Sequence, residues 1–120
     1  MAKILVIDDQ DSVRSFLRLV LEQEGHEVTE ASNGHHGLAV YQRTPADLVI
    51  ADIRMPEMNG LDLILELTRC FLDVKVLAIS GASDAKESLS TAKLLGARQV
   101  LQKPFSLEKF LSLVRYELAH

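Results

Sequence analysis

Short apolar runs alternate with amphipathic stretches five times along the chain, and this alternation predicts a fold built from repeated strand–helix units. The apolar runs lie at 3–7, 26–31, 47–51, 74–80 and 98–102. Runs of this length, each followed by a helical pattern, are typical of βα units around a mostly parallel sheet. We therefore expect an α/β protein with a doubly wound sheet.

Helical periodicity follows each apolar run. After the first run, apolar residues recur at helical spacing on one face, and Gly25 is placed to end that helix: Val13, Phe16, Leu17, Val20 and Leu21. After the last run Ser106 is a natural N-cap, and the same spacing returns: Leu107, Phe110, Leu111, Val114 and Leu118. The pattern predicts three further helices at about 34–43, 60–70 and 84–95.

Differences among the apolar runs predict the order of the strands. The runs at 3–7, 47–51 and 74–80 are nearly all aliphatic, as strands covered on both faces must be. The run at 26–31 alternates polar and apolar residues, and the run at 98–102 is bracketed by polar side chains, so both are expected at the sheet edges. This arrangement fits the doubly wound order 2-1-3-4-5.

Composition narrows the class of protein. With 120 residues, we expect a single domain over 1–120. The net charge of -4, without a lysine or arginine cluster, argues against direct nucleic-acid binding. The single cysteine, Cys70, excludes an intramolecular disulfide and suggests no redox pair. No segment is long and apolar enough for a membrane span or resembles a signal peptide, so we expect a cytoplasmic protein.

Polar residues whose side chains could take part in catalysis or ligand binding follow four of the five predicted strands. In an open parallel sheet, ligands bind beyond the carboxyl ends of the strands. The residues at those ends are Asp8, Asp9, Asp52, Ser80 and Lys103 followed by Pro104. Each alone fits an ordinary turn or helix start, but four independent turns would have to supply this combination by accident.

Three carboxylates at one sheet edge would repel one another unless cations share the site. Lys103 and one divalent ion together neutralise the three negative charges. Mg²⁺ suits carboxylate, carbonyl and water ligands and keeps positions open for phosphate oxygens. A carboxylate nucleophile, a metal, a lysine and a hydroxyl together form a set suited to phosphoryl transfer.

Five segments, in order, give the chain its resemblance to a known family. They are I-L-V-I-D-D, D-L-V-I-A-D-I-R-M-P-E-M-N-G, L-A-I-S-G, L-L-G-A and Q-K-P-F. From about Lys3 to Leu118 the chain resembles the receiver domain of a two-component response regulator. The resemblance implies a flavodoxin-like (βα)5 fold, with two helices on one face of the sheet and three on the other.

The resemblance also implies a role for each residue of the site. Asp52 would be the phosphoacceptor and, with Asp9 and the backbone carbonyl of Arg54, a ligand of Mg²⁺, with Mn²⁺ as an alternative metal. Asp8 would assist through water. Lys103 would pair with the phosphoryl group and Ser80 would swing to hydrogen-bond it.

Further positions carry supporting roles or depart from the family pattern. Gly81 would let a phosphoryl group approach the backbone, and Pro104, after a cis bond by family resemblance, would direct Lys103. Pro56 and Gly60 would shape the loop beneath Asp52. Arg54 and Ala82 would lie at the rim and tune attack by water. Val100 stands where receivers typically carry an aromatic switch residue, so we expect signalling to use Ser80 and the segment after the fourth strand.

The leading functional prediction is a switch that takes a phosphoryl group from a histidine kinase or histidine phosphotransfer protein and then binds an unidentified downstream protein. It would catalyse only its own phosphorylation and dephosphorylation. Homodimerisation on phosphorylation is one option, and the chain could be a stand-alone receiver or part of a longer regulator. A degenerate receiver that acts as a phosphate-independent interaction module is the alternative. A phosphohydrolase acting on other substrates is disfavoured because Arg54 stands where that class carries a second aspartate.

Overall fold

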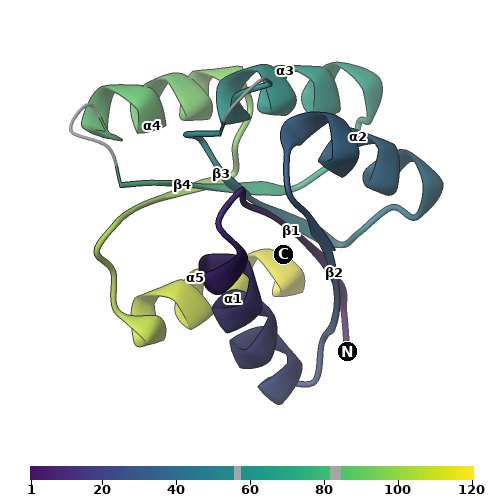
Figure 1. Ribbon diagram of the computed structural model, residues 1–120, viewed down its shortest axis with the longest axis vertical. Coiled ribbons are helices and arrows are strands. Elements are labelled where there is room, and N and C mark those ends of the chain that lie inside the picture. Colours follow the sequence, from purple (N-terminus) through teal and green to yellow (C-terminus); the bar gives the residue numbers. More distant parts are fainter. Residues whose placement is uncertain (56–57, 82–84) are drawn as a thin grey trace.

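A computed structural model describes residues 1–55, 58–81 and 85–120. Within these residues, five parallel strands form one sheet in the order β2-β1-β3-β4-β5, and five helices connect or follow them (Figure 1). The strands are β1 (Lys3–Ile7), β2 (Glu27–Ala31), β3 (Leu48–Asp52), β4 (Val76–Ser80) and β5 (Gln99–Gln102). The helices are α1 (Asp11–Gln23), α2 (Gly34–Arg43), α3 (Gly60–Cys70), α4 (Ala85–Leu95) and α5 (Leu107–Ala119). The predicted fold class and strand order are therefore confirmed.

The burial of the strands follows the hydrophobic pattern that predicted their order. Every residue of β3 and β4 is buried, and β1 is buried beyond its first residue. The edge strand β2 buries Val28 in one apolar layer and Ala31 in the other, and it leaves Glu27 and Thr29 exposed. In register, Ile7 pairs with Ala51, Asp52 with Ile79 and Ser80 with Gln102. This register brings the polar residues that end β1, β3, β4 and β5 to one edge of the sheet.

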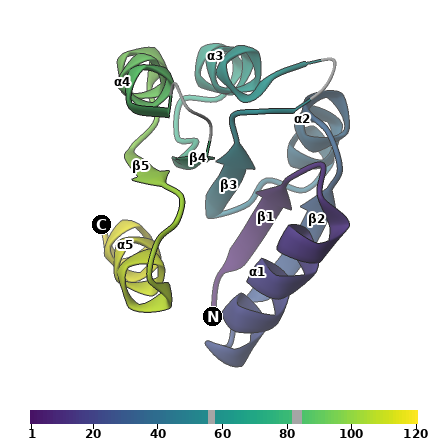
Figure 2. The same cartoon turned by 60° about the vertical axis from the view of Figure 1, so that its left-hand side comes forward.

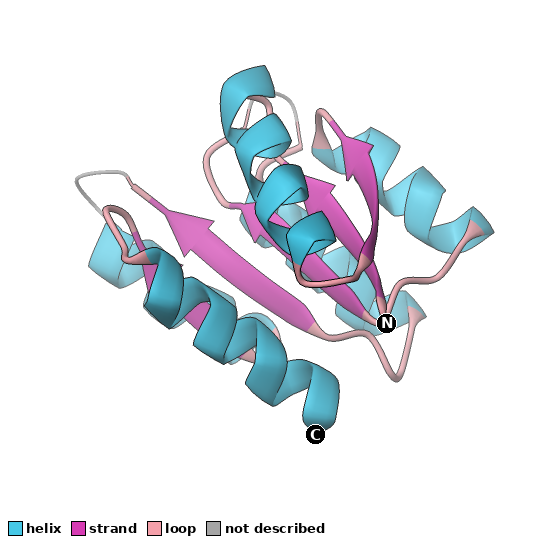
Figure 3. Cartoon of the chain, turned by 90° about the horizontal axis from the view of Figure 1, so that it is seen from below, coloured by secondary structure: helices cyan, strands magenta, loops and turns pink. Residues whose placement is uncertain are grey.

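Helices cover both faces of the sheet in the distribution that the resemblance implied. One apolar layer contains side chains of α2, α3 and α4, and the other contains side chains of α1 and α5. Figure 3, seen from the side of α1 and α5, shows these two helices in front of the strands. Among the described residues, no helix combines the length and the apolar character that a membrane crossing needs.

The helix boundaries agree with the predicted ranges, and the sequence reasons for them are visible. Asn33, Asn59 and Ser106 each cap a helix by accepting a hydrogen bond from a backbone N–H in the first turn. Gly25 follows α1 with a φ of 90°, a conformation that favours glycine. The expected start of the fourth helix at residue 84 lies outside the described residues, and α4 is described from Ala85.

One expectation for α1 is wrong. Leu17, Val20 and Leu21 are buried, as their spacing predicted, but Phe16 is 53% exposed. Phe16 therefore lies on the flank of the buried face of α1, although it shares the helical spacing of the buried residues. Its ring instead lines a surface hollow with Val13, Lys103 and Phe105.

The last helix is fixed to the edge strand through a buried carboxylate. Glu117 of α5 is 2% exposed and accepts a hydrogen bond from the Gln99 side-chain amide at 2.7 Å. Arg98 Nε lies 3.3 Å from the other carboxylate oxygen. Lys75 Nζ donates to the Glu117 backbone carbonyl at 2.6 Å. These contacts hold β5, and hence the loop that begins at Lys103, against the rest of the sheet.

Candidate functional site

Three carboxylates meet where β1 and β3 end side by side. Asp8 and Asp9 follow the last residue of β1, and Asp52 is the last residue of β3. One oxygen from each of the three side chains lies within 4.8 Å of the others. The predicted convergence of the three carboxylates is therefore confirmed. It arises because neighbouring parallel strands that pair in register end at the same edge of the sheet.

Lys103 reaches the same point from the loop after β5. Its Nζ lies 3.8 Å from Asp52 Oδ2, and its backbone N–H donates to the Ser80 carbonyl at 2.9 Å. The bond between Lys103 and Pro104 is cis, as expected. A Cβ atom on Gly81 would lie 3.0 Å from Lys103 Cδ. The glycine thus leaves room for the lysine side chain to cross β4 toward Asp52.

Burial sets the electrostatics of the carboxylates. Asp8 and Asp52 are 3% and 7% exposed. Loss of solvent raises the pKa of both above the usual aspartate range, while the Lys103 charge opposes that rise. Backbone N–H groups also lower the pKa of each: Gln10 donates to Asp8 Oδ1 at 2.9 Å, and Arg54 to Asp52 Oδ1 at 3.3 Å. The carboxylates therefore carry a net energetic cost that a bound cation would relieve.

A solvent-accessible hollow of about 330 Å³ opens above these carboxylates. Its lining residues are Asp9, Gln10, Asp52, Arg54, Gly81 and Lys103. Asp8 is not among them, which separates the buried Asp8 from the exposed Asp9. Ser80 ends β4, has no exposed surface and is not among the residues that line the hollow.

Two further residues support the site: Arg14 was not predicted from the sequence, whereas Gly60 was expected in the loop beneath Asp52. Arg14 donates to the Asp8 backbone carbonyl at 2.6 Å and pairs with Asp11 and Glu30, so it fixes the turn that presents Asp8 and Asp9. A Cβ on Gly60 would lie 2.4 Å from the Ile53 Cα, which requires glycine where the chain folds back under Asp52. The i,i+3 spacing of Asp11 and Arg14 was a signal for the first contact, whereas the second depends on a close approach that spacing does not show.

The remaining predicted positions lie at different distances from the carboxylates. Arg54 is exposed and lines the hollow, in agreement with a place at the rim. Pro104 is exposed in the loop that carries Lys103. Val100 lies on β5 and is partly buried against the apolar layer of α2, α3 and α4. Ala82 and Pro56 lie outside the described residues.

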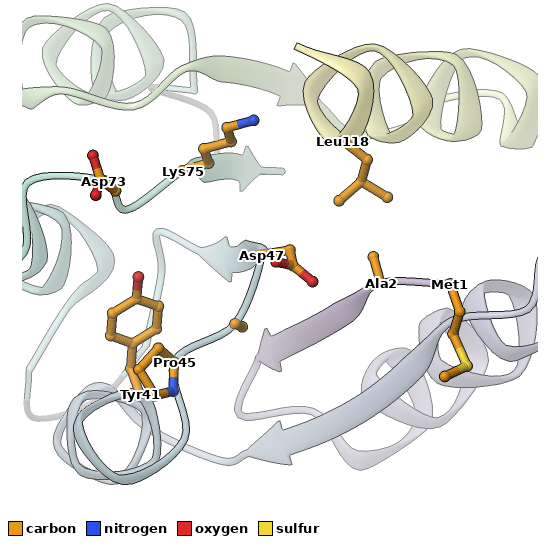
Figure 4. Close-up of a pocket in the computed structure, with 9 residues that line it drawn as sticks. Met1, Ala2, Tyr41, Pro45, Asp47, Asp73, Lys75 and Leu118 are labelled. Atoms are coloured by element: carbon orange, nitrogen blue, oxygen red, sulfur yellow. The ribbon is translucent and has the colours of Figure 1, made fainter.

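A larger hollow, of about 520 Å³, lies near the N-terminus at the opposite end of the strands (Figure 4). Its polar lining includes Asp47 and Lys75, but both are engaged in the fold. Asp47 Oδ2 accepts from the Lys3 N–H at 2.8 Å, and Lys75 Nζ binds the α5 backbone. Converging carboxylates and an ammonium group are found instead at the hollow beside Asp52.

The donor set at Asp52 fits a hard divalent cation. Carboxylate oxygens at these separations, one from an exposed and two from buried side chains, can share one ion. The ammonium of Lys103 and the exposed opening leave space for a further anionic group beside Asp52. This combination can hold a phosphoryl group next to a carboxylate nucleophile.

Comparison with known proteins gives a consistent result. Residues 4–115 match the family model of the response regulator receiver domain. The chain is 33% identical to the chemotaxis protein CheY of Thermotoga maritima over 104 residues, covering 86% of each protein. It is 34% identical to protein PilH of Pseudomonas aeruginosa, covering 99% of each. A receiver domain protein from Clostridium thermocellum superposes with a TM-score of 0.93 at 29% identity, covering 99% of this chain and 95% of that one.

Other similar proteins are longer. A probable transcriptional regulatory protein of Picosynechococcus is 36% identical over 121 residues, which cover 95% of this chain and 48% of that protein. The chain thus spans about half the length of the transcriptional regulators it matches. The shared part is the segment that contains the aspartates and the lysine.

Proposed function

Because the chain belongs to the family of response regulator receiver domains, we propose that it accepts a phosphoryl group on Asp52 and thereby switches its binding to a partner protein. Receiver domains act with histidine kinases or phosphotransfer proteins in two-component signalling. A phosphohistidine on such a protein is the proposed donor. The proposed site of action is the cytoplasm.

One observation carries this proposal. The Asp52 carboxylate lies within 4.8 Å of two further carboxylates and 3.8 Å from the Lys103 ammonium, at the mouth of an open hollow. A merely structural ion pair has no need of two extra acidic groups. A nucleophile that must accept a dianionic phosphoryl group does need neighbouring groups that hold cations.

In the proposed transfer, an Asp52 oxygen forms a bond to phosphorus while the bond from phosphorus to the donor imidazole nitrogen breaks. The imidazole leaves with the bonding electron pair and takes up a proton. Lys103 balances charge on the phosphoryl oxygens, and the Ser80 hydroxyl turns to donate to one of them. In the reaction that resets the switch, water attacks phosphorus, the bond from phosphorus to the Asp52 oxygen breaks, and inorganic phosphate is released.

The proposed metal ligands are Asp9, Asp52 and the Arg54 carbonyl, with Asp8 acting through water. The exposure of Asp9 and the burial of Asp8 support this division. Bound Mg²⁺, or Mn²⁺ in its place, would supply charge neutralisation for the phosphoryl oxygens. Asp8, held by the Gln10 N–H, would orient the water that completes the coordination.

We propose that the donor protein docks directly beside the site. A hollow of about 380 Å³ has mostly apolar walls from Val13, Phe16 and Leu17 of α1 and from Phe105. Gln10 and Lys103 line both this hollow and the one above Asp52. A helix of the donor that packs here would bring its phosphohistidine next to Asp52.

The decisive experiment is incubation with acetyl phosphate and Mg²⁺, followed by intact mass measurement of wild type and Asp52→Asn. We expect one added phosphoryl group on the wild type and none on the variant, and no addition when EDTA replaces Mg²⁺. Addition to both proteins would move the acceptor away from Asp52. No addition to either would support the phosphate-independent interaction module, and turnover of an added phosphomonoester would support an external hydrolase.

A further inference from the structure

The hollow of about 520 Å³ at the opposite end of the strands has no part in the proposed phosphoryl transfer. Figure 2 shows this end as the foot of the sheet, where the N-terminus lies away from the arrowheads of β1 and β3. Its volume lies within the range of about 300–1,000 Å³ that is typical of small-molecule sites. We call it the basal hollow, and the lining residues that bear on its chemistry are Tyr41, Pro45, Asp47, Asp73, Lys75 and Leu118.

Tyr41 of α2 brings a hydroxyl group without a partner to the basal hollow. The residue is 5% exposed, and its ring packs edge-on against Phe71 with the ring centroids 4.8 Å apart. Figure 4 shows the hydroxyl directed away from Pro45 and toward the space between Asp73 and Asp47. Among the described residues, no group forms a hydrogen bond with this hydroxyl. A buried polar group without a partner is costly, so the phenol is available to a ligand.

Two carboxylates act on the same phenol. Asp73 is exposed, and within the described part of the chain its side chain forms no hydrogen bond or ion pair. Asp47 accepts from the Lys3 N–H through Oδ2 at 2.8 Å, which leaves Oδ1 open. Burial raises the pKa of the Tyr41 hydroxyl, and the charges of Asp73 and Asp47 raise it further. The phenol therefore stays protonated beside two negative charges.

The cationic groups of the chain at this end do not neutralise the two aspartates. Lys75 Nζ donates to the Glu117 backbone carbonyl at 2.6 Å, and Figure 4 shows its nitrogen turned toward α5. Met1 is 98% exposed and, in the residues described, pairs with neither aspartate. Pro45 and Leu118 add apolar surface to the wall. The open groups of the basal hollow thus combine negative charge and hydrogen-bond acceptors with an apolar wall.

We propose that the basal hollow binds an alkylguanidinium group, with the guanidinium against Tyr41, Asp47 and Asp73 and the aliphatic stem against Pro45 and Leu118. A guanidinium carries five N–H donors in a planar fork, so one group can reach acceptors on three separate segments. A bare metal ion would leave the apolar wall and most of the volume unused. The same group occurs on a free guanidine and on an arginine side chain of another protein. The proposal goes beyond the proposed function and does not depend on it.

The test is a titration of the ¹⁵N-labelled protein with butylguanidine, followed by amide NMR. We expect saturable shifts in the signals of Ala46 and Asp73, which line the hollow. Butylurea has nearly the same shape without the charge, so it should bind about tenfold more weakly for want of attraction to two carboxylates. A blocked Gly-Arg-Gly peptide distinguishes the two sources. Tighter binding of the peptide would support an arginine of a partner protein, and equal or weaker binding would support a free guanidine.

Two variants test the assigned contacts. Tyr41→Phe keeps the ring against Phe71, so it should weaken butylguanidine binding about fivefold through the loss of one hydrogen bond. Asp73→Asn should weaken binding about three- to fivefold through the loss of one exposed charge pair. Tyr116→Phe and Asp62→Asn make the same chemical changes at exposed positions outside the hollow. These matched controls should bind butylguanidine as the wild type does.

Three results would overturn the proposal: equal binding of butylurea and butylguanidine, the same shifts with Mg²⁺ alone, or unchanged affinity in both Tyr41→Phe and Asp73→Asn. The last result would show that Tyr41 is only a solvated phenol. Both variants should still gain a phosphoryl group from acetyl phosphate, since neither residue lines the Asp52 hollow. Saturable butylguanidine binding by a wild type that gains no phosphoryl group would count against the proposed function alone.

Discussion

Asp52 combines burial with close negative neighbours, and both features oppose its ionisation. It is 7% exposed, and its nearest compensating charge, Lys103, is 3.8 Å away. Its pKa is raised chiefly by burial. Holding an ionised carboxylate in these surroundings lowers the free energy of unfolding. Binding of a cation or a proton at the site would restore it.

This cost predicts a pH-dependent effect of Asp52→Asn in EDTA. Since the folded pKa lies above the unfolded one, the folded state holds more protons between the two values, and the free energy of unfolding falls as pH rises through that window. Near neutral pH the Asn variant should therefore be more stable than wild type, by on the order of 1 kcal/mol. The difference should shrink below about pH 4.

Urea denaturation at several pH values measures this difference. Asp73→Asn is the matched control, because Asp73 is exposed and its replacement should change stability little. A less stable Asp52→Asn protein near neutral pH would contradict the expected electrostatic cost.

Arg54 carries a second prediction at this scale. Its exposed side chain lines the hollow beside Asp52, and we expect it to limit the approach of water there. Arg54→Ala should shorten the lifetime of phosphorylated Asp52 by about two- to tenfold, a barrier change of up to about 1.4 kcal/mol, while phosphorylation by acetyl phosphate proceeds.

Decay of the phosphorylated protein by intact mass gives the lifetime. Arg54→Met restores side-chain length without charge and separates steric exclusion of water from an effect of the guanidinium. An unchanged decay rate in Arg54→Ala would show that the arginine is only a solvated surface residue.

At the scale of the elements, α1 has one face in the core and an exposed flank beside the site. Its inner face packs Leu17, Val20 and Leu21 against the sheet. Its flank leaves Phe16 exposed beside Phe105 and Lys103. An exposed aromatic ring next to the reactive edge has no role in the core, so it is a candidate contact for the phosphoryl donor.

We expect Phe16→Ala to slow phosphoryl transfer from a phosphohistidine donor protein by about tenfold, the cost of one buried interface contact. Phosphorylation by acetyl phosphate should be unchanged, since the small donor needs no protein surface. Stability should change little because the ring is largely exposed.

Leu19→Ala is the control on the same helix. Leu19 is 56% exposed but does not line the hollow, so its replacement should leave both reactions as they are. Equal slowing by the two substitutions would place the donor elsewhere on α1.

At the scale of the whole molecule, the sheet concentrates charge that is scattered along the sequence. Residues from the ends of β1 and β3 and from the loop after β5 converge at one edge, whereas Asp47 and Lys75 at the opposite end of the strands are engaged in the fold. A ligand bound between these elements would bridge them, so binding and global stability are linked.

Mg²⁺ at one hundred times its dissociation constant should raise the free energy of unfolding by about 2.7 kcal/mol. Asp9→Ala should abolish most of this gain because Asp9 is the proposed direct ligand, and Asp8→Ala should reduce it less. Thermal or urea unfolding with NaCl at matched ionic strength isolates the specific effect. Equal loss in the two variants would contradict the division between direct and water-mediated ligands.

The sequence by itself determined the class of the fold, the strand order and the residues that share one sheet edge. These follow from short-range rules, since period and burial identify the strands, and parallel register then gathers Asp8, Asp9, Asp52 and Lys103. Arg14 was missed because its role depends on a backbone carbonyl contributed by another segment.

Only the tertiary structure decided which apolar residues of one helical pattern are buried. It also decided which surfaces of the molecule are hollowed. Phe16 belongs to the same helical apolar pattern as Leu17 but is exposed, and a hollow that Val100 lines is enclosed by residues of α4, β5 and α5. The spacing of apolar residues predicts on which face of a helix or strand a side chain lies. Whether that face is covered, and where cavities form, depends on the position and length of the neighbouring elements.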